Sequence, residues 1–498
     1  MGKTITTPIK DNARNGNSKS TNMNARFVSG SILKHVIYMT GATSVGLMSI
    51  FFVELVDMYF ISLLGEEVLA AAIGFSGAIT FFVFSISIGL SIGLAAVVSR
   101  TIGEGKGDQA KSVIFNGLLI SFLLMTLIAI PVFIYTRELL SLVGAEGKTL
   151  DYAVKYMHIA VLSLPVISIG MSMGAVLRAV GAAKESMIST IIAGIVNVIL
   201  DPIFIFTLDL HIEGAAYATL AARLTMALVA AIILARHMGI SVFRPQGGLF
   251  EDVNSISKIA IPAALTSLAT PFANSYITVA VANYGADAIA GLAIISRITP
   301  FAFAAVFALS AALGPIVGQN IGAGLNIRVK EALTSSLFVI FAVVCATSLI
   351  MTFTADFIVY LFNATGQSAD LLIFFCVFTS WSFIFTGAQF IANAAFNNMN
   401  RATWSTFANW SKATIGTIPF IWIGGNLAGA KGIMAGQAIG SIIFGILSII
   451  VAYYIVDRPT KSVGPRYFGA MLPAVLSQFG WQRFLEERWN ADPRNQKD

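Results

Sequence analysis

Long apolar runs separated by short polar stretches follow one another along almost the whole chain. A helix needs roughly 20 apolar residues to cross the hydrocarbon of a bilayer. Twelve runs approach or exceed this length, near residues 35–62, 69–98, 110–135, 152–178, 187–207, 214–236, 258–281, 287–318, 329–353, 369–397, 402–424 and 432–456. The pattern predicts an all-α polytopic membrane protein with twelve transmembrane helices. The second and eighth runs are long enough to kink, at Gly89 and Gly93 or at Pro300 and Pro315.

The polar stretches predict how these helices are oriented. An even number of spans places both termini on one side of the membrane. That side carries 24 Lys and Arg residues in its loops and tails, against 4 on the opposite side. Because Lys and Arg concentrate in cytoplasmic loops, we expect both termini to be cytoplasmic. The chain is then a multi-pass protein of the cell inner (plasma) membrane.

Composition excludes several other classes of protein. Only 11% of the 498 residues are charged and 56% are hydrophobic, whereas soluble domains carry about 25% charged residues. The net charge of +6 follows from membrane topology, so we expect no nucleic-acid partner. The four His and two Cys residues show no metal-ligand or disulfide spacing. We therefore expect no cofactor and no enzyme, although a membrane-embedded enzyme stays open as an alternative.

The second half of the chain repeats the first. Residues 100–105 align with residues 319–324 at an offset of 219, Gly65 with Gly285 at 220, and Gly214 with Gly432 at 218. Six spans return the chain to its starting side, so the repeat predicts two six-helix lobes in the same orientation. Such lobes are related by a pseudo-twofold axis along the membrane normal.

The repeat divides the chain into five parts. We expect a cytoplasmic N-terminal tail at 1–34, an N-lobe at 35–236, a cytoplasmic linker at 237–257, a C-lobe at 258–456 and a cytoplasmic C-terminal tail at 457–498. The spacing of apolar residues in the last part is consistent with either an interfacial amphipathic helix or a solvated tail.

Three acidic residues lie inside apolar runs, and all three are in the N-lobe. Glu54 and Asp57 share a face of the first predicted helix, and Asp201 lies in the fifth. A charge at the bilayer centre costs at least about 2.5–3.5 kcal/mol, so such residues normally face a cavity or a partner. We expect these acids to form one functional site.

Helix geometry places other polar groups beside these acids. At about 1.5 Å per residue, Asp57 and Asp201 both lie about 12 Å below the outer ends of their helices, and Thr219 lies about 8 Å deep. Asn197 is one turn from Asp201, and Pro202 frees a carbonyl oxygen nearby. A proton, a sodium ion or an organic cation can each neutralise this cluster. The sequence therefore predicts a site at which a coupling ion and an exported compound alternate.

Several blocks in order make the chain resemble the MATE family of multidrug and toxic compound extrusion proteins, in its DinF-like branch. They are residues 56–60 (VDMYF) with Leu64-Gly65, residues 103–105 (GEG), residues 177–181 (LRAVG) and residues 197–206 (NVILDPIFIF). The resemblance implies a secondary active antiporter that exports amphipathic organic cations in exchange for H⁺ or Na⁺, and we expect a monomer in the lipid bilayer.

The resemblance also implies site residues. Asp57, Asn197, Asp201 and Thr219 match the family's cation site, where Na⁺ can bind, and Tyr156 matches a nearby tyrosine. No acid lies in the C-lobe spans, so coupling is expected in the N-lobe alone. Two residues depart from the family pattern. Ala42 stands where a proline is usual, and Glu54 stands where an uncharged residue is common.

The substrate cavity is predicted from aromatic residues near the lobe interface. These residues are Phe272, Tyr276, Trp381 and Phe385, together with Phe390. They can line a cavity and attract cations through their ring faces. The alternative is that they pack in the protein core. A lipid-linked glycan flippase is the alternative transport function. It favours a strongly cationic cavity, for which the spans offer only Arg223, Arg297 and Lys412. The chain contains no phosphate-binding GxxxxGK[ST] motif, so we do not expect ATP to drive transport.

Overall fold

The structure, a computed structural model, describes residues 25–65, 67–244 and 247–458, and these are helical with no strand. The predicted C-terminal interfacial helix lies outside this part of the chain. Within it, nine helices are long and apolar enough to cross a membrane, and two pairs of helices bent by 46° add two further spans. A twelfth span arises because the last apolar segment turns back on itself.

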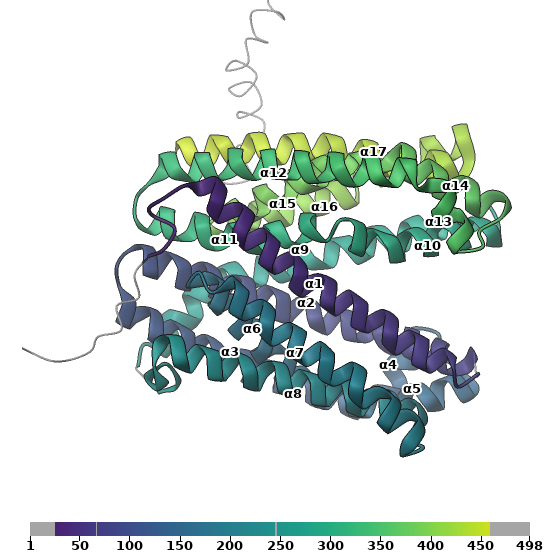
Figure 1. Ribbon diagram of the computed structural model, residues 1–498, viewed down its shortest axis with the longest axis horizontal. Helices are drawn as coiled ribbons and strands as arrows, with labels where there is room; N and C mark the ends of the chain where they lie inside the picture. The colour runs from purple at the N-terminus through teal and green to yellow at the C-terminus, as the bar shows by residue number, and fades with distance from the viewer. Residues whose placement is uncertain (1–24, 66, 245–246, 459–498) are drawn as a thin grey trace, which may run out of the picture.

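The N-lobe contains the first six spans (Figure 1). They are formed by α1 (Ile32–Ser62), α2 (Glu67–Gly103), α3 (Gly107–Ile134), the bent pair α5 (Gly147–Leu162) and α6 (Leu164–Ala179), α7 (Ala183–Pro202) with the π-helical turn η1 (Ile203–Thr207), and α8 (His211–Met238), while the short α4 (Thr136–Leu142) caps one end. The 3-10 turn η2 (Ile240–Phe243) leads toward the second lobe.

The C-lobe repeats this order. It contains α9 (Leu249–Ala282), α10 (Ala286–Ala302), α11 (Ala304–Gly322), α12 (Asn326–Phe353), α13 (Ala355–Leu361), α14 (Gly366–Val377), η3 (Thr379–Ser382), α15 (Phe383–Asn398), α16 (Ala402–Ala413) and α17 (Ile418–Asp457). Six of these helices begin 219 residues after their counterparts in the N-lobe. The pairs are α2 and α10, α3 and α12, α4 and α13, α5 and α14, α6 and α15, and α7 and α16. The predicted fold of twelve helices in two six-helix lobes is confirmed.

Two predicted spans have a different local form. The eighth is broken at Phe303 into α10 and α11, whereas α2 continues unbroken through Gly89 and Gly93. The eleventh and twelfth spans are joined in α17, whose backbone leaves the helical region at Ala428 and at Gly429, where φ is 62°. The segments on either side pack backbone to backbone, because a Cβ on Gly424 would lie 2.0 Å from the carbonyl oxygen of Gly432.

The linker between the lobes is shorter than predicted. Helix α9 begins at Leu249 rather than near residue 258, so its first two turns take up part of the expected 237–257 segment. This polar extension is anchored on the N-lobe, because Asp252 Oδ2 accepts hydrogen bonds from Asn116 Nδ2 at 2.7 Å and from Ser112 Oγ at 3.0 Å. The low hydropathy of these residues concealed the helix.

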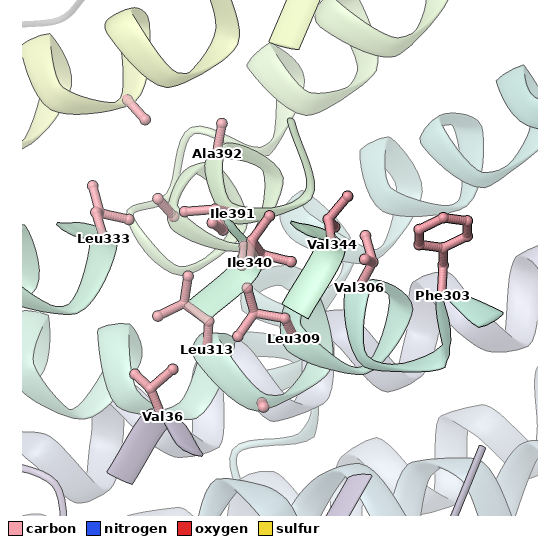
Figure 2. Close-up of a cluster of buried hydrophobic side chains, with 14 of the residues drawn as sticks. Val36, Phe303, Val306, Leu309, Leu313, Leu333, Ile340, Val344, Ile391 and Ala392 are labelled. Atoms are coloured by element: carbon pink, nitrogen blue, oxygen red, sulfur yellow. The ribbon is translucent and has the colours of Figure 1, made fainter. Parts of the chain in front are cut away.

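The main hydrophobic core of the C-lobe lies among α11, α12 and α15 (Figure 2). Leu309 and Leu313 of α11 and Ile340 of α12 are buried there, and Val36 of α1 joins them from the first lobe. In Figure 1, α1 accordingly begins beside the C-lobe helices and ends beside those of the N-lobe. Helix α1 therefore ties the two lobes together.

Glycines bring the lobes into backbone contact at the end that the sequence predicts to be cytoplasmic. A Cβ on Gly103 would lie 2.1 Å from the carbonyl oxygen of Gln319, and one on Gly322 would lie 2.1 Å from that of Arg100. Gln319 Nε2 also donates to the carbonyl oxygen of Ala179 at 2.9 Å. From this end the two layers of helices in Figure 1 diverge toward the end that carries α4 and α13.

Candidate functional site

Helices α1 and α7 bring two acids and an amide together within the N-lobe. Asn197 Nδ2 donates a hydrogen bond to Asp57 Oδ1 at 3.3 Å. Asp201, one turn farther along α7, is 0% exposed and Asn197 is 4% exposed. The carboxyl group of Asp57 is close enough to that of Asp201 for the two to interact. The structure thus places the buried Asn197 and Asp201 beside the half-buried Asp57 in one cluster.

The two carboxylate oxygens of Asp201 lack hydrogen-bond partners within the described part of the chain. When Asp201 is a carboxylate, neither of its oxygens has a hydrogen-bond donor among the described residues. An unpaired buried charge is strongly unfavourable. A proton on either carboxyl group allows a hydrogen bond between Asp57 and Asp201, and a bound cation neutralises both. The pair is therefore suited to hold a small positive ion.

The backbone around Asp201 is unusual. Pro202 follows it directly and has no N–H to donate, and the next residues form the π-helical turn η1, closed by a 2.9 Å bond from Leu208 N to Ile203 O. Such π turns occur often at functional sites. Gly214 lets α8 approach this turn, since a Cβ there would lie 2.6 Å from the carbonyl carbon of Phe204. Pro202 was the only sequence signal for this distortion.

Three other predicted site residues lie on α8, α5 and α1. The Thr219 hydroxyl donates to the carbonyl oxygen of Ala215 at 2.9 Å within α8, which leaves its oxygen lone pairs available to a cation. Tyr156 is half-buried and close enough to interact electrostatically with Asp57 and Asp201. Glu54 is exposed, so it lies at the edge of the cluster and not at its centre.

Arg223 adds a positive charge near the acids. The sequence alone allowed two roles for it, a counter-ion to the acids or a packing residue. Its guanidinium group donates to Ser163 Oγ at the break between α5 and α6 and lies 5.0 Å from the ring centroid of Phe84. It also interacts electrostatically with Asp57 and Glu54. Arg223 therefore faces the acids from α8 and offsets part of their negative charge.

The donor set fits a hard monovalent cation better than a transition metal. Carboxylate, amide and hydroxyl oxygens of Asp57, Asp201, Asn197 and Thr219 are the ligand types used for Na⁺ in transporters. Within the described residues no group of three or more His, Cys, Asp or Glu could hold a metal ion. These residues would hold Na⁺ through oxygen atoms, or a proton through the paired carboxyl groups.

The C-lobe contains a large cavity of about 450 Å³. Its lining combines amides, hydroxyls, one lysine and phenylalanine rings, among them Thr379, Phe383, Gln389, Phe390, Asn409 and Lys412. With the exception of Phe51 of α1, all lining residues come from the C-lobe. A cavity of this size is in the range that binds small organic molecules.

Of the predicted cavity residues, Phe390 lines this cavity, whereas Phe272, Tyr276, Trp381 and Phe385 do not, and their part in binding a substrate stays a prediction. Phe272 packs against Trp410 with ring centroids 5.4 Å apart, and Trp381 Nε1 donates to the carbonyl oxygen of Val377 at 3.1 Å. Tyr276 packs against the C-lobe core. Phe272, Trp381 and Tyr276 thus make packing contacts outside this cavity.

Comparisons with known proteins agree with this architecture. The MatE family model matches residues 42–203 and 262–423, one segment in each lobe. The chain is 29% identical over 447 residues to a FAD transporter of Shewanella oneidensis, covering 88% of this chain and 97% of that protein. It is 26% identical over 450 residues to the multidrug export protein MepA of Staphylococcus aureus, covering 87% of this chain and 96% of MepA.

A solved structure shows the same fold. The crystal structure of a mutant of the Vibrio cholerae MATE transporter VcmN superimposes with a TM-score of 0.82 at 26% sequence identity, covering 86% of this chain and 97% of that one. The two chains therefore share the arrangement of the lobes as well as their sequence blocks.

Proposed function

The chain belongs to the MatE family of membrane transporters, and from this premise we propose that it is a secondary active exporter of amphipathic organic compounds that couples to H⁺ or Na⁺ in the N-lobe. The observation that carries the proposal is the cluster of Asp57, Asn197 and Asp201 between α1 and α7, in which Asp201 is fully buried. These residues form an ion site whose charge is unbalanced when it is empty.

The proposed mechanism follows from that imbalance. Helix α1 contacts α11 of the C-lobe as well as α7 of the N-lobe, so a change in how Asp57 packs against Asp201 can alter the contact between lobes. An ion that binds one arrangement of the lobes more tightly shifts the population toward it. Ion entry and export of the compound then alternate between two states of one molecule.

One relative is named as a transporter of FAD and another as a multidrug export protein. The amphipathic organic cations expected from the resemblance would compete with the coupling ion at the N-lobe acids. We propose that the chain lies in the plasma membrane with both termini in the cytoplasm, because the positively charged loops favour this orientation. Exchange of one H⁺ for one monovalent cation is electroneutral, and each further charge adds about 2.3 kcal/mol per 100 mV.

Transport by purified protein in liposomes tests this proposal. Vesicles loaded with ethidium are given an inward pH gradient or an inward sodium gradient, with no ATP present. We expect one of the two gradients to drive ethidium out, and the matching ionophore to stop it. Equal efflux with and without either gradient would contradict secondary coupling.

A second test concerns Glu54, whose carboxyl group is exposed but interacts electrostatically with Asp57 and Arg223. Glu54→Gln is expected to slow efflux by a few fold or to move its pH optimum, because it removes a negative charge near the ion site. Efflux rates measured between pH 6 and 8 show the change. An unaltered rate and pH profile would give Glu54 a packing role only.

A further inference from the structure

The C-lobe cavity lies at the end of a row of polar contacts between α15 and α16. Ser405 Oγ donates to Asn397 Oδ1 at 3.0 Å, and one turn farther Asn409 Nδ2 donates to Asn393 Oδ1 at 3.0 Å. The pairing shows that the two helices run antiparallel in register. The next turn of each helix brings Gln389 level with Lys412, and both side chains line the cavity.

The side chains at this level are hydrogen-bond donors without acceptors. Gln389 is 1% exposed and its Nε2 has no acceptor among the described residues, and the hydroxyl of Thr379, 8% exposed, has no partner there either. The ammonium group of Lys412 forms no ion pair with any acid in the described part of the chain. Buried donors normally have partners, so Gln389 and Thr379, together with the half-buried Lys412, indicate a ligand that accepts hydrogen bonds.

The charge of the cavity points to an anion. Among the residues that the structure describes, Lys412 is the only charged one that lines it, and no carboxylate does. Lys412 lies ten residues from the start of α16, which is about 15 Å along the helix at 1.5 Å per residue and therefore deep in the membrane. An ionisable residue at such depth usually faces a partner or a transport pathway.

The remaining lining favours an aromatic body for the ligand. Phe307 and Phe390 line the cavity with ring centroids 5.6 Å apart, and Phe383, also in the lining, stacks on Phe303 at 4.0 Å. The repeat also shows that these donors are specific to the C-lobe. At an offset of 219, Lys412 and Gln389 correspond to Ala193 and Gly170, so the N-lobe has neither donor at the equivalent positions.

We propose that the C-lobe cavity binds an aromatic compound that carries a phosphate or carboxylate group, with Lys412 and Gln389 holding the anion and the phenylalanine rings holding the aromatic part. That this compound is also exported rests on the proposed function. The binding itself does not, because it needs no ion gradient. The ion site in the N-lobe and this second binding site in the C-lobe then carry opposite charges.

Flavins provide matched probes, because riboflavin and FMN share one fluorescent ring system and differ by a phosphate. Binding to the purified full-length protein in lipid nanodiscs is followed by flavin fluorescence. We expect FMN to bind at least tenfold more tightly than riboflavin. A carboxylated aromatic dye competing with FMN extends the test from phosphate to carboxylate.

Substitutions then assign the effect to Lys412. Lys412→Met is expected to weaken FMN binding at least tenfold and to leave riboflavin binding within twofold, whereas Lys412→Arg keeps FMN binding within a few fold. Arg297→Met is the matched control, because Arg297 is exposed on α10 and does not line the cavity. Retained riboflavin binding shows that the Lys412→Met protein is folded.

Other outcomes would overturn the inference. Equal affinity for FMN and riboflavin in the unmodified protein would do so, and so would an FMN affinity that Lys412→Met leaves unchanged. Tighter binding of ethidium than of FMN, insensitive to Lys412→Met, would assign the cavity to cations. FMN binding that survives in a protein without gradient-driven efflux would support this site while rejecting the proposed coupling.

Discussion

Asp201→Asn is expected to reduce gradient-driven efflux to the level of cells without the transporter. Asparagine fills the same space, but it can neither bind a proton nor balance the charge of a sodium ion. Because neither Asp201 oxygen has a hydrogen-bond donor among the described residues, the substitution removes a costly unpaired charge, so the variant should be produced normally. Ethidium accumulation in cells, together with the amount of protein in the membrane, measures the effect.

Asp57→Asn is expected to have the same effect, because Asp57 and Asp201 hold one ion between them. For the same reason the double variant should be no worse than either single one, as is usual for residues that act as a unit. Asp209→Asn is the matched control. Asp209 follows η1 and its side chain is 85% exposed. Normal ethidium efflux by either the Asp57 or the Asp201 variant would reject the proposed ion site.

Gly103→Ala is expected to have the second-largest effect, this time on the contact between lobes. A methyl group there would lie 2.1 Å from the carbonyl oxygen of Gln319, which is backbone and cannot move aside as a side chain can. Overpacking of this kind typically costs about 1–3 kcal/mol. We expect a lower thermal midpoint and a loss of efflux, because the lobes can no longer close against each other at this end.

Gly74→Ala on the same helix provides the comparison. A Cβ at Gly74 has no other atom within 4 Å, and alanine favours a helix over glycine by about 1 kcal/mol. This variant should be as stable as the parent or slightly more so, with normal efflux. If both alanine variants behave alike in thermal unfolding and transport, close packing at Gly103 is not important.

Most of the fold could be predicted because hydrophobic length and charged loops are direct consequences of the bilayer. The local breaks were harder to predict. Pro300 marked the region in which the eighth span breaks, yet the break falls at Phe303, while Gly89 and Gly93 interrupt nothing. Each of these glycines instead lets α2 approach the backbone of α9 closely. A glycine that bends a helix and one that lets another helix approach look the same in a sequence.

The functional sites were predictable to different degrees. Asp57 and Asp201 stood out because a charge inside an apolar run is costly and therefore conspicuous. The C-lobe cavity did not stand out, because Gln389 and Thr379 are neutral and become informative only when their missing partners are seen. Of the aromatic residues chosen for the cavity only Phe390 lines the one in the C-lobe, since rings pack against other helices as readily as they line a cavity. The DinF-like branch stays a prediction.

The central claim, that Asp57 and Asp201 hold one small cation together, can be tested by infrared difference spectroscopy of the purified protein in nanodiscs. We expect a carboxylic-acid band that disappears at high pH or on addition of Na⁺, and that is absent from both the Asp57→Asn and the Asp201→Asn variants. A band that persists unchanged in either variant would show that the two carboxyl groups do not share an ion, which would contradict the account.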